Sequence, residues 1–392
     1  MTSRAQGQTL VILALVSFVM LLGVGIVVPM LPTYAQGIGA TATQIGLIFA
    51  GFSLSRTIFT PIIGALADRS ELKRLMIIGL AGYALLSLAY AAAATPWQLI
   101  LIRVLHGTAS AFVIPLAMSY AASIAGRGRE GVYMGTLNTA LFFGMGAGPL
   151  IGGLLTDGYG PTSAFYALTA LSSLALGLAV VLLPPLRRER PPEGAGTLKG
   201  ILKNRSLVGL LLFRIINALG SGNLMAFIPI LAHRAGLSTT AIGVLITTNI
   251  FVTGSLQRPF GRLVTPANTF SMIVIGSALS IAALASLPLA PGFAVYLALG
   301  CLMGLGGAIS MPAASVLVLE HGRTLGMSAT MGIFDAAMGL GMIVGPLVSG
   351  VIMEYLGIGY VFSIGGLVSA LGMCVFMALA GKDRPAGELE GR

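Results

Sequence analysis

The stretch GPLIGG at residues 148–153 has a near copy, GPLVSG, at residues 345–350. The copies are 197 residues apart (345 minus 148), and the same offset aligns further residues without a gap from Pro32 to Glu354. The aligned pairs are Pro32 with Pro229, Gly46 with Gly243, Gly64 with Gly261, Gly107 with Gly304, Pro115 with Pro312, and Asp157 with Glu354. A register kept over this length predicts two homologous halves in parallel orientation, arranged around a central path.

The composition is that of a membrane protein. Of the 392 residues, 56% are hydrophobic and 9% are charged, and the mean hydropathy is +0.96, whereas a soluble domain carries about 25% charged residues. A membrane-spanning helix needs roughly 20 apolar residues. Twelve such runs are present, six in each half, at about 10–34, 44–66, 75–94, 97–121, 131–155, 163–185, 206–232, 240–262, 269–289, 293–319, 326–352 and 360–380. We therefore expect an all-α membrane protein with twelve transmembrane helices, the first of which is a span and not a cleaved signal peptide.

A polar segment separates the two halves. It reads RRERPPEGAGTLKG at residues 187–200, and its prolines, glycines and charges are typical of a linker. We expect an N-terminal six-helix bundle at residues 1–186, a cytoplasmic linker at 187–205, and a C-terminal six-helix bundle with a short cytoplasmic tail at 206–392.

Positive charge is unevenly distributed between the connecting segments. With both termini in the cytoplasm, the cytoplasmic segments hold 18 of the 22 basic residues, and only Arg234 lies in an outer loop. This asymmetry predicts that both termini are cytoplasmic. It also explains the net charge of +10, so no nucleic-acid partner is expected. The cysteines, Cys301 and Cys374, lie in different apolar runs and indicate neither a disulfide nor a metal site.

Four motifs resemble those of the major facilitator superfamily. GALADRSELKR at 64–74 resembles the motif A loop, and LILIRVLHGTASA at 99–111 resembles motif B, with Arg103 as its arginine. GMGAGPLIGG at 144–153 is similar to motif C, which marks the drug:proton antiporter branch, and LLGVGIVVPMLPTY at 21–34 resembles the first-helix motif of that branch. The resemblance covers essentially the whole chain and implies the major facilitator fold.

The resemblance also implies roles for residues of motifs A and C. In the family, the motif A aspartate bonds to the neighbouring half and holds the outward-facing state, while a loop that only sets topology is the alternative. The conformational switch would comprise Gly64, Asp68, Arg69 and Arg262. The motif C glycines recur every four residues and share one helix face, where small residues allow close packing and proline bends the helix. A hinge or simple packing would involve Gly144, Gly148, Pro149, Gly152, Gly345 and Pro346.

Few ionisable residues lie well inside the apolar runs. They are Arg56, Arg103, Arg214 and Asp335, with His106 as a further candidate. A charge in mid-membrane costs several kcal/mol, so each should face a partner or a watery path. Motif B implies that Arg103 interacts with a proton-carrying group, and the imidazole of His106, one turn away, suits proton handling. The alternatives are a structural arginine bonded to carbonyls and a histidine that makes a helix–helix bond.

Asp335 is the buried acid available for proton coupling. It lies about nine residues, or ~13 Å, into the eleventh helix, while the helices that usually carry the carboxylate in similar antiporters contain none here. Arg56 lies at a similar depth, ~18 Å, in the second helix, which faces the eleventh in this fold. We expect an Asp335–Arg56 ion pair between the halves in one conformation, which protonation of Asp335 weakens. A static structural pair is the alternative.

The buried arginines leave an excess of positive charge. Arginine binds carboxylates and phosphates well, so an organic acid, a siderophore or a lipid headgroup competes with a lipophilic cation as substrate. The candidate substrate-binding residues are Arg56, Asn138, Arg214, Asn217, Asn223 and Asn249.

These features predict a secondary active transporter of the inner, cytoplasmic membrane and not an enzyme. We expect a monomer that exports small amphipathic molecules or drugs in exchange for protons, by rocking one half against the other. The proton gradient takes the place of a cofactor, no ATP-binding loop is present, and no metal site is expected. The alternatives are an exporter of anionic or zwitterionic solutes, a lipid flippase, or, in a different class, a membrane scaffold or sensor that transports nothing.

Overall fold

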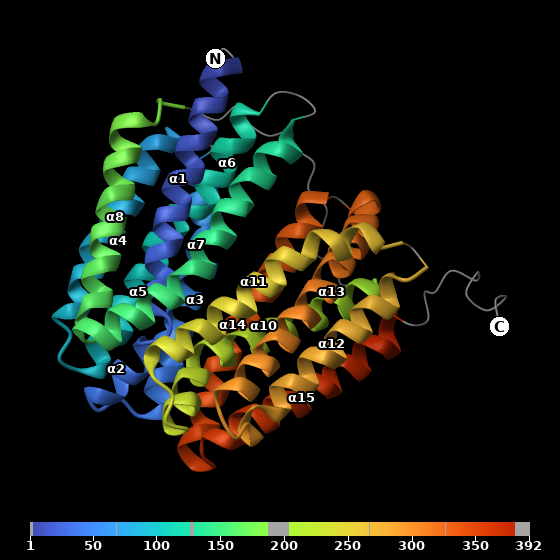
Figure 1. Ribbon diagram of the computed structural model, residues 1–392. Helices are drawn as coiled ribbons and strands as arrows, with labels where there is room; N and C mark the ends of the chain where they lie inside the picture. Colours follow the sequence, from blue (N-terminus) through green and yellow to red (C-terminus); the bar gives the residue numbers. More distant parts are fainter. Residues whose placement is uncertain are drawn as a thin grey trace. The chain divides into compact units, whose positions relative to one another are not determined.

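The computed structural model describes residues 3–67, 69–125, 129–186, 204–265, 267–325 and 327–380, which form helices joined by short connections (Figure 1). The first group is α1 (Ser3–Val27), α2 (Leu31–Gly37), α3 (Ala42–Ala67), α4 (Leu72–Ala91), α5 (Pro96–Ala111), α6 (Ile114–Ile124), α7 (Glu130–Tyr159) and α8 (Thr162–Leu182). The second group is α10 (Arg205–Arg234), α11 (Thr239–Leu263), α12 (Thr269–Ser286), the 3-10 helix η1 (Leu287–Leu289), α13 (Phe293–Leu325), α14 (Met327–Tyr355) and α15 (Ile358–Ala380).

The helices have the length and composition of membrane spans. In the described part of the chain, 12 helices are long and apolar enough to cross a membrane, with α5 and α6 together forming the fourth, Pro96–Ile124. Large apolar side chains also lie on the surface, among them Leu85 (71% exposed) on α4 and Val181 (77% exposed) on α8. Such a surface suits contact with lipid tails, which are as apolar as leucine. The predicted all-α membrane fold with twelve spans is confirmed.

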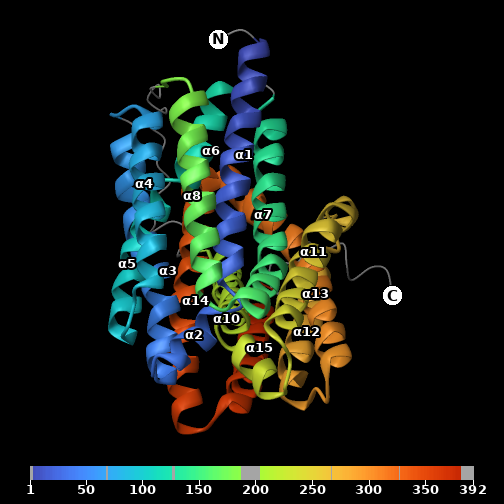
Figure 2. The ribbon, with the colours of Figure 1, turned by 60° about the vertical axis from the view of Figure 1, so that its left-hand side comes forward.

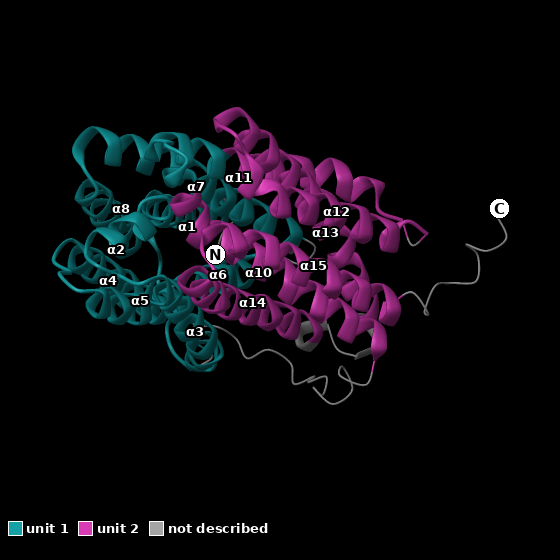
Figure 3. Cartoon of the chain, turned by 90° about the horizontal axis from the view of Figure 1, so that it is seen from below, with its two compact units in different colours: residues 1–191, 232–247 teal, residues 192–231, 248–392 magenta. Residues whose placement is uncertain are grey.

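The chain forms two compact units, which Figure 3 colours separately. Unit 1 comprises Met1–Pro191 and Ala232–Thr247, and unit 2 comprises Pro192–Leu231 and Thr248–Arg392. The first turns of α11 therefore belong to unit 1. Most of the predicted linker, residues 187–203, lies outside the described residues, and the predicted bundle boundaries and the cytoplasmic placement of both termini stay predictions.

Within unit 1, α1 runs alongside α7 and α8, as Figure 2 shows, while α3 packs on α5 and α4 packs on α8. Within unit 2, α12 packs on α13 and α15, and α14 contacts both α13 and α15. An apolar core lies between the helices of unit 2. Its buried members include Leu207, Leu210, Phe213, Ile273, Val318, Phe334 and Phe376.

The helix boundaries repeat with the sequence offset. Four helices of the first group begin 197 residues before a helix of the second (239 minus 42, 269 minus 72, 293 minus 96, 327 minus 130). The matching starts are Ala42 with Thr239, Leu72 with Thr269, Pro96 with Phe293, and Glu130 with Met327. The repeat in the sequence is therefore a repeat of helices.

Packing between helices follows the same repeat. A Cβ added at Gly107 of α5 would lie 3.0 Å from the carbonyl carbon of Phe52 in α3, and one added at Gly304 of α13 would lie 2.7 Å from the carbonyl oxygen of Asn249 in α11. Gly304 and Asn249 are the counterparts of Gly107 and Phe52 at the offset of 197 (304 minus 107, 249 minus 52). Because small residues let helix backbones approach closely, glycine occupies both crossings.

The fourth span differs between the two halves. It is divided in unit 1, where α5 ends at Ala111 and α6 begins at Ile114, with Pro115 in the first turn of α6. Proline is well tolerated there because the first N–H groups of a helix have no intrahelical acceptor. The counterpart α13 runs without a break although it contains Pro312. The presence of the proline alone does not determine whether this span is divided.

Candidate functional site

Arg214 of α10 is a half-buried cation of unit 2 that has weak hydrogen-bond partners. Its Nη1 lies 3.0 Å from the sulfur of Met311 in α13, and its Nη2 lies 3.0 Å from the sulfur of Met338 in α14. The guanidinium carbon stands 4.9 Å from the centroid of the Phe334 ring. Among the described residues, the buried Nε has no acceptor. Because thioether sulfur accepts hydrogen bonds weakly, these contacts satisfy the guanidinium only in part.

Asp335 lies on α14, the helix that supplies Phe334 and Met338 to the surroundings of Arg214. It follows Phe334 directly and precedes Met338 by one turn, which places it at the edge of the α14 face that contacts Arg214. The charge of Asp335 acts electrostatically on Arg214. The side chain of Asp335 is exposed, although its position in an apolar run predicted a buried acid. Unit 2 therefore carries a carboxylate and a guanidinium cation on neighbouring helices.

The predicted asparagine contacts fall into two groups. Asn223, 1% exposed, accepts a hydrogen bond from the Ser349 hydroxyl at 2.8 Å and joins α10 to α14. Asn249 donates to the carbonyl of Gly300 at 2.9 Å and joins α11 to α13. Asn217 is half-buried on α10, and Asn138 is exposed on α7 of unit 1. Asn223 and Asn249 therefore join helices in this conformation. Substrate contact by any of the four asparagines stays a prediction.

Arg103 and His106 lie in a buried aromatic cluster of unit 1. Arg103, 9% exposed, donates from Nε to the carbonyl of Ile48 at 3.3 Å, and its guanidinium carbon lies 4.7 Å from the centroid of the Phe52 ring. His106, 2% exposed, shares a hydrogen bond of 3.0 Å between its Nδ1 and the Tyr90 hydroxyl. These contacts link α3, α4 and α5. The geometry matches the structural alternatives for both residues, and a role in proton coupling stays a prediction.

The motif C glycines pack α7 onto α1 within unit 1. A Cβ added at Gly144 would lie 2.5 Å from a backbone carbonyl oxygen of α1, and one added at Gly148 would lie 2.5 Å from the Cα of Gly25. At Gly152 it would overlap the backbone of Ile26. Carbon atoms normally meet at about 3.5–4.0 Å, so the contact between these helices requires glycine. Helix α7 continues through Pro149.

The second copy of this motif packs α14 onto α10 in unit 2. A Cβ added at Gly345 would lie 2.9 Å from the carbonyl oxygen of Leu219. The ring of Pro346 approaches within 3.1 Å of a Cβ added at Gly222, which is the counterpart of Gly25 (222 minus 25 is 197). The two copies of the motif therefore mediate equivalent contacts, α7 with α1 and α14 with α10. Their action as hinges stays a prediction.

A second contact of α7 was not found by sequence reasoning. Within unit 1, Gly153 faces the first turn of α11, and a Cβ added there would lie 2.6 Å from the carbonyl oxygen of Thr239. The carboxylate of Asp157 accepts hydrogen bonds from the backbone N–H of Thr239 at 3.1 Å and of Thr240 at 2.8 Å. A carboxylate is favourable at the positive end of a helix. The alignment of Asp157 with Glu354 was the available signal, but it did not indicate this partner.

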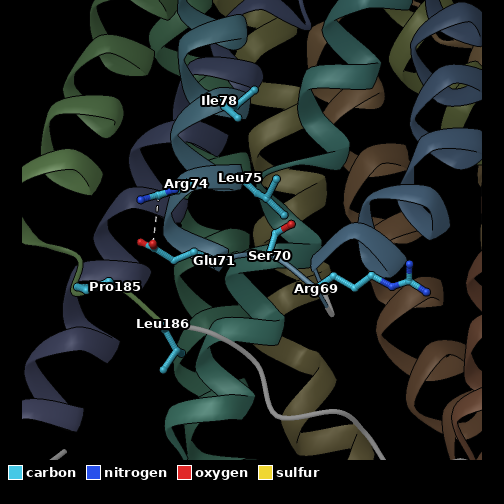
Figure 4. Close-up of a pocket in the computed structure, with 8 residues that line it drawn as sticks. All are labelled: Arg69, Ser70, Glu71, Arg74, Leu75, Ile78, Pro185 and Leu186. Atoms are coloured by element: carbon cyan, nitrogen blue, oxygen red, sulfur yellow. Dashed lines mark ion pairs between the residues drawn. The ribbon is translucent and has the colours of Figure 1, made fainter.

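The motif A loop lines an open pocket of about 660 Å³ in unit 1, shown in Figure 4. Glu71 and Arg74 form an ion pair of 3.2 Å, while the side chain of Arg69 points away from that pair. Asp68 lies outside the described residues, and a Cβ added at Gly64 would meet no atom within 4 Å. The pocket residues are Arg69, Ser70, Glu71, Arg74, Leu75, Ile78, Pro185 and Leu186. The switch formed by these motif A residues stays a prediction.

Arg56 and Arg262 are the two arginines that were predicted to act between the halves. Arg56 is half-buried on α3 of unit 1, where its carbonyl accepts a hydrogen bond from the Thr60 hydroxyl at 2.8 Å. Arg262 is exposed on α11 in unit 2. The Asp335–Arg56 ion pair, substrate contact by Arg56 and the switch role of Arg262 stay predictions.

A metal site or a disulfide requires particular ligands or a particular geometry. The described residues contain no group of three or more His, Cys, Asp or Glu that could hold a metal ion. Cys301 is half-buried and Cys374 is exposed, and both are free thiols.

Known proteins are similar to this chain in sequence or in fold. The model of the Major Facilitator Superfamily matches residues 13–216 and 210–391. An uncharacterized MFS-type transporter of Methanocaldococcus jannaschii is 30% identical over 360 residues, which are 90% of this chain and 93% of that protein. Multidrug resistance protein 2 of Bacillus subtilis is 25% identical over 393 residues, with 95% of each chain covered. The crystal structure of the nucleoside transporter NupG is similar in fold, with a TM-score of 0.78 at 16% identity, covering 95% of this chain and 98% of that one.

The twelve spans and these matches define a multi-pass transporter of the cell membrane, which is not an enzyme. The chain belongs to the Major Facilitator Superfamily. The expected family and fold are thereby confirmed.

Proposed function

We propose that the protein exports small amphipathic molecules or drugs in exchange for protons, as a monomer that works by alternating access. The likeness to Multidrug resistance protein 2 over 95% of both chains supports export of this substrate class. The two-fold repeat of helices supports alternating access, in which one half rocks against the other around a central site.

The position of the Asp335 carboxylate within α14 is the observation that carries the proposal. Among the described helices, it is the one carboxylate more than two turns from both ends of its helix, eight residues after Met327 (335 minus 327) and therefore about 12 Å along α14. An acid at such a position is costly unless it has a partner or a function. Arg214 supplies a positive charge within unit 2 that interacts electrostatically with Asp335, and the side chain of Asp335 is exposed.

Competition at Asp335 would couple the proton to the substrate. A proton and a cationic substrate group both require the negative charge of this carboxylate, so that binding of one reduces binding of the other. Protonation also removes the attraction of Asp335 for Arg214 and, in the predicted ion pair, for Arg56. A difference in these interactions between two conformations shifts their populations. The proton gradient then supplies the energy without a cofactor, and Arg103 and His106 are secondary candidates for relaying the proton.

Transport of ethidium into liposomes tests this function. Purified protein is reconstituted into liposomes with an acidic interior, so that outward proton movement can drive inward ethidium movement. We expect protein-dependent accumulation that an uncoupler abolishes. The same rate with and without the pH gradient would contradict proton coupling, and the absence of protein-dependent ethidium movement would contradict drug export. Protein-free liposomes with the same gradient serve as the control.

A further inference from the structure

We propose that unit 2 binds zwitterionic amphipathic molecules. The acidic group of the ligand would bind Arg214 and its ammonium group would bind Asp335. The apolar body of the ligand would lie against Met311, Phe334 and Met338. This inference names the substrate class of the proposed transporter and rests on that function, because the same acid serves both.

Arg214 has the unused donors that an acidic group requires. A guanidinium carries five N–H donors in a planar fork, and in this structure its described polar contacts are two thioether sulfurs, 3.0 Å away, with the buried Nε left without an acceptor. A buried donor without an acceptor is unfavourable. A carboxylate or phosphate presents two oxygens that fit one edge of the fork as a bidentate pair. Such a group would satisfy Nε and improve on the sulfur contact.

Asp335 provides the complementary charge on the neighbouring helix. Its side chain is exposed, and its charge and that of Arg214 interact. A purely cationic ligand gains the attraction of Asp335 but is opposed by Arg214, and a purely anionic ligand gains the attraction of Arg214 but is opposed by Asp335. A ligand that carries both charges gains both attractions. The pair therefore selects for a dipolar charge pattern.

The residues around Arg214 are apolar and are expected to select ligands mainly by hydrophobicity. The sulfurs of Met311 and Met338 and the ring of Phe334 surround the guanidinium. Methionine is unbranched and polarizable, and it adapts to ligands of different shape. We therefore expect the site to discriminate by charge pattern and to tolerate a range of apolar bodies.

A matched series of fluorescent probes tests the inference. Dansyl-lysine is zwitterionic, dansylcadaverine is the same molecule without the carboxylate, and dansyl-aminohexanoic acid lacks the ammonium group. Fluorescence titration of the purified full chain is expected to show dansyl-lysine binding about tenfold more tightly than either relative, the effect of one charge-assisted hydrogen bond. Arg214→Gln should remove this advantage and leave dansylcadaverine binding undiminished. Asp335→Asn should weaken dansyl-lysine and dansylcadaverine but not the acid.

Control variants separate recognition from folding. Arg258→Gln, at an exposed arginine of α11 in the same unit, should leave all three affinities unchanged. Arg214→Lys keeps the charge but loses the bidentate fork, and it should weaken dansyl-lysine several-fold even if Arg214→Gln does not fold. Equal wild-type affinity for the three probes, or equal loss of all three in both Arg214 variants, would overturn the inference.

The binding experiment and the transport experiment can fail independently. Ethidium export without preferential dansyl-lysine binding would refute the zwitterion site and leave the transporter proposal intact. Binding of dansyl-lysine that depends on Arg214, without proton-driven transport, would refute the proposed function instead.

Discussion

Gly148→Ala is expected to separate α1 from α7 and destabilise unit 1. The added Cβ would lie 2.5 Å from the Cα and 2.6 Å from the carbonyl carbon of Gly25, and 2.7 Å from the carbonyl oxygen of Leu22. Since carbon atoms pack at about 3.5 Å or more, the helices must move apart by about 1 Å. All three obstructing atoms belong to the backbone, so that no side-chain rotation can relieve the overlap.

The expected cost follows from this displacement. Overpacking of a tight contact costs about 1–3 kcal/mol, and the higher helix propensity of alanine offsets up to about 1 kcal/mol. A net loss of about 1–2 kcal/mol lowers Tm by about 2–8 °C for a unit of this size. Thermal unfolding of the purified protein in detergent, followed by circular dichroism, measures this shift.

Gly177→Ala is the matched control. Gly177 lies within α8 of the same unit, and a Cβ added there would meet no atom within 4 Å, so its Tm should equal or slightly exceed that of the wild type. If Gly148→Ala unfolds at the same temperature as Gly177→Ala, the account of α1–α7 packing is wrong.

Two further contacts can be tested by removing one partner. Asp157→Ala deprives the N–H groups of Thr239 and Thr240 of their acceptors, and hydrogen exchange at these two amides should accelerate about tenfold. Ser349→Ala leaves the buried Asn223 oxygen without the donor that now lies 2.8 Å away, and should lower the free energy of unfolding by about 1–2 kcal/mol, as measured by chemical denaturation.

These two predictions have internal references. For Asp157→Ala, amides in the middle of α11 should exchange as in the wild type, and unchanged rates at the first turn would show that the cap contributes nothing. For Ser349→Ala, the reference is Ser286→Ala, whose hydroxyl donates to a carbonyl of its own helix, that of Ala282. Equal stability of both serine variants would argue against the α10–α14 bond.

The sequence was sufficient for the architecture because the signals for it are periodic or local. Apolar runs of membrane length predicted the twelve spans, and the constant offset predicted two homologous halves, in which helices begin at equivalent residues such as Ala42 and Thr239. The division of the fourth span between α5 and α6 was not predicted. Pro115 and Pro312 are equivalent in sequence, yet only the first lies beside a break, so the proline alone does not predict the division.

The site was less predictable because its contacts join separate helices. Arg214 and Asp335 stood out as charges in apolar runs, but the sulfur contacts of Arg214 depend on how α13 and α14 pack against α10. Asn223 was predicted as a substrate contact, and the structure bonds it to Ser349. An asparagine in an apolar helix indicates a polar contact, and its sequence position does not reveal whether the partner is a ligand or another helix.

Proton-driven transport by Asp335→Asn tests the central claim most directly. The variant removes the ionisable group of α14 and retains nearly the same side-chain volume. Reconstituted into liposomes with an acidic interior, it is predicted to lose ethidium accumulation driven by the pH gradient, because it lacks both the proton-binding group and the charge that attracts the cation. Accumulation at the wild-type rate would contradict the assignment of Asp335 as the proton-coupling group.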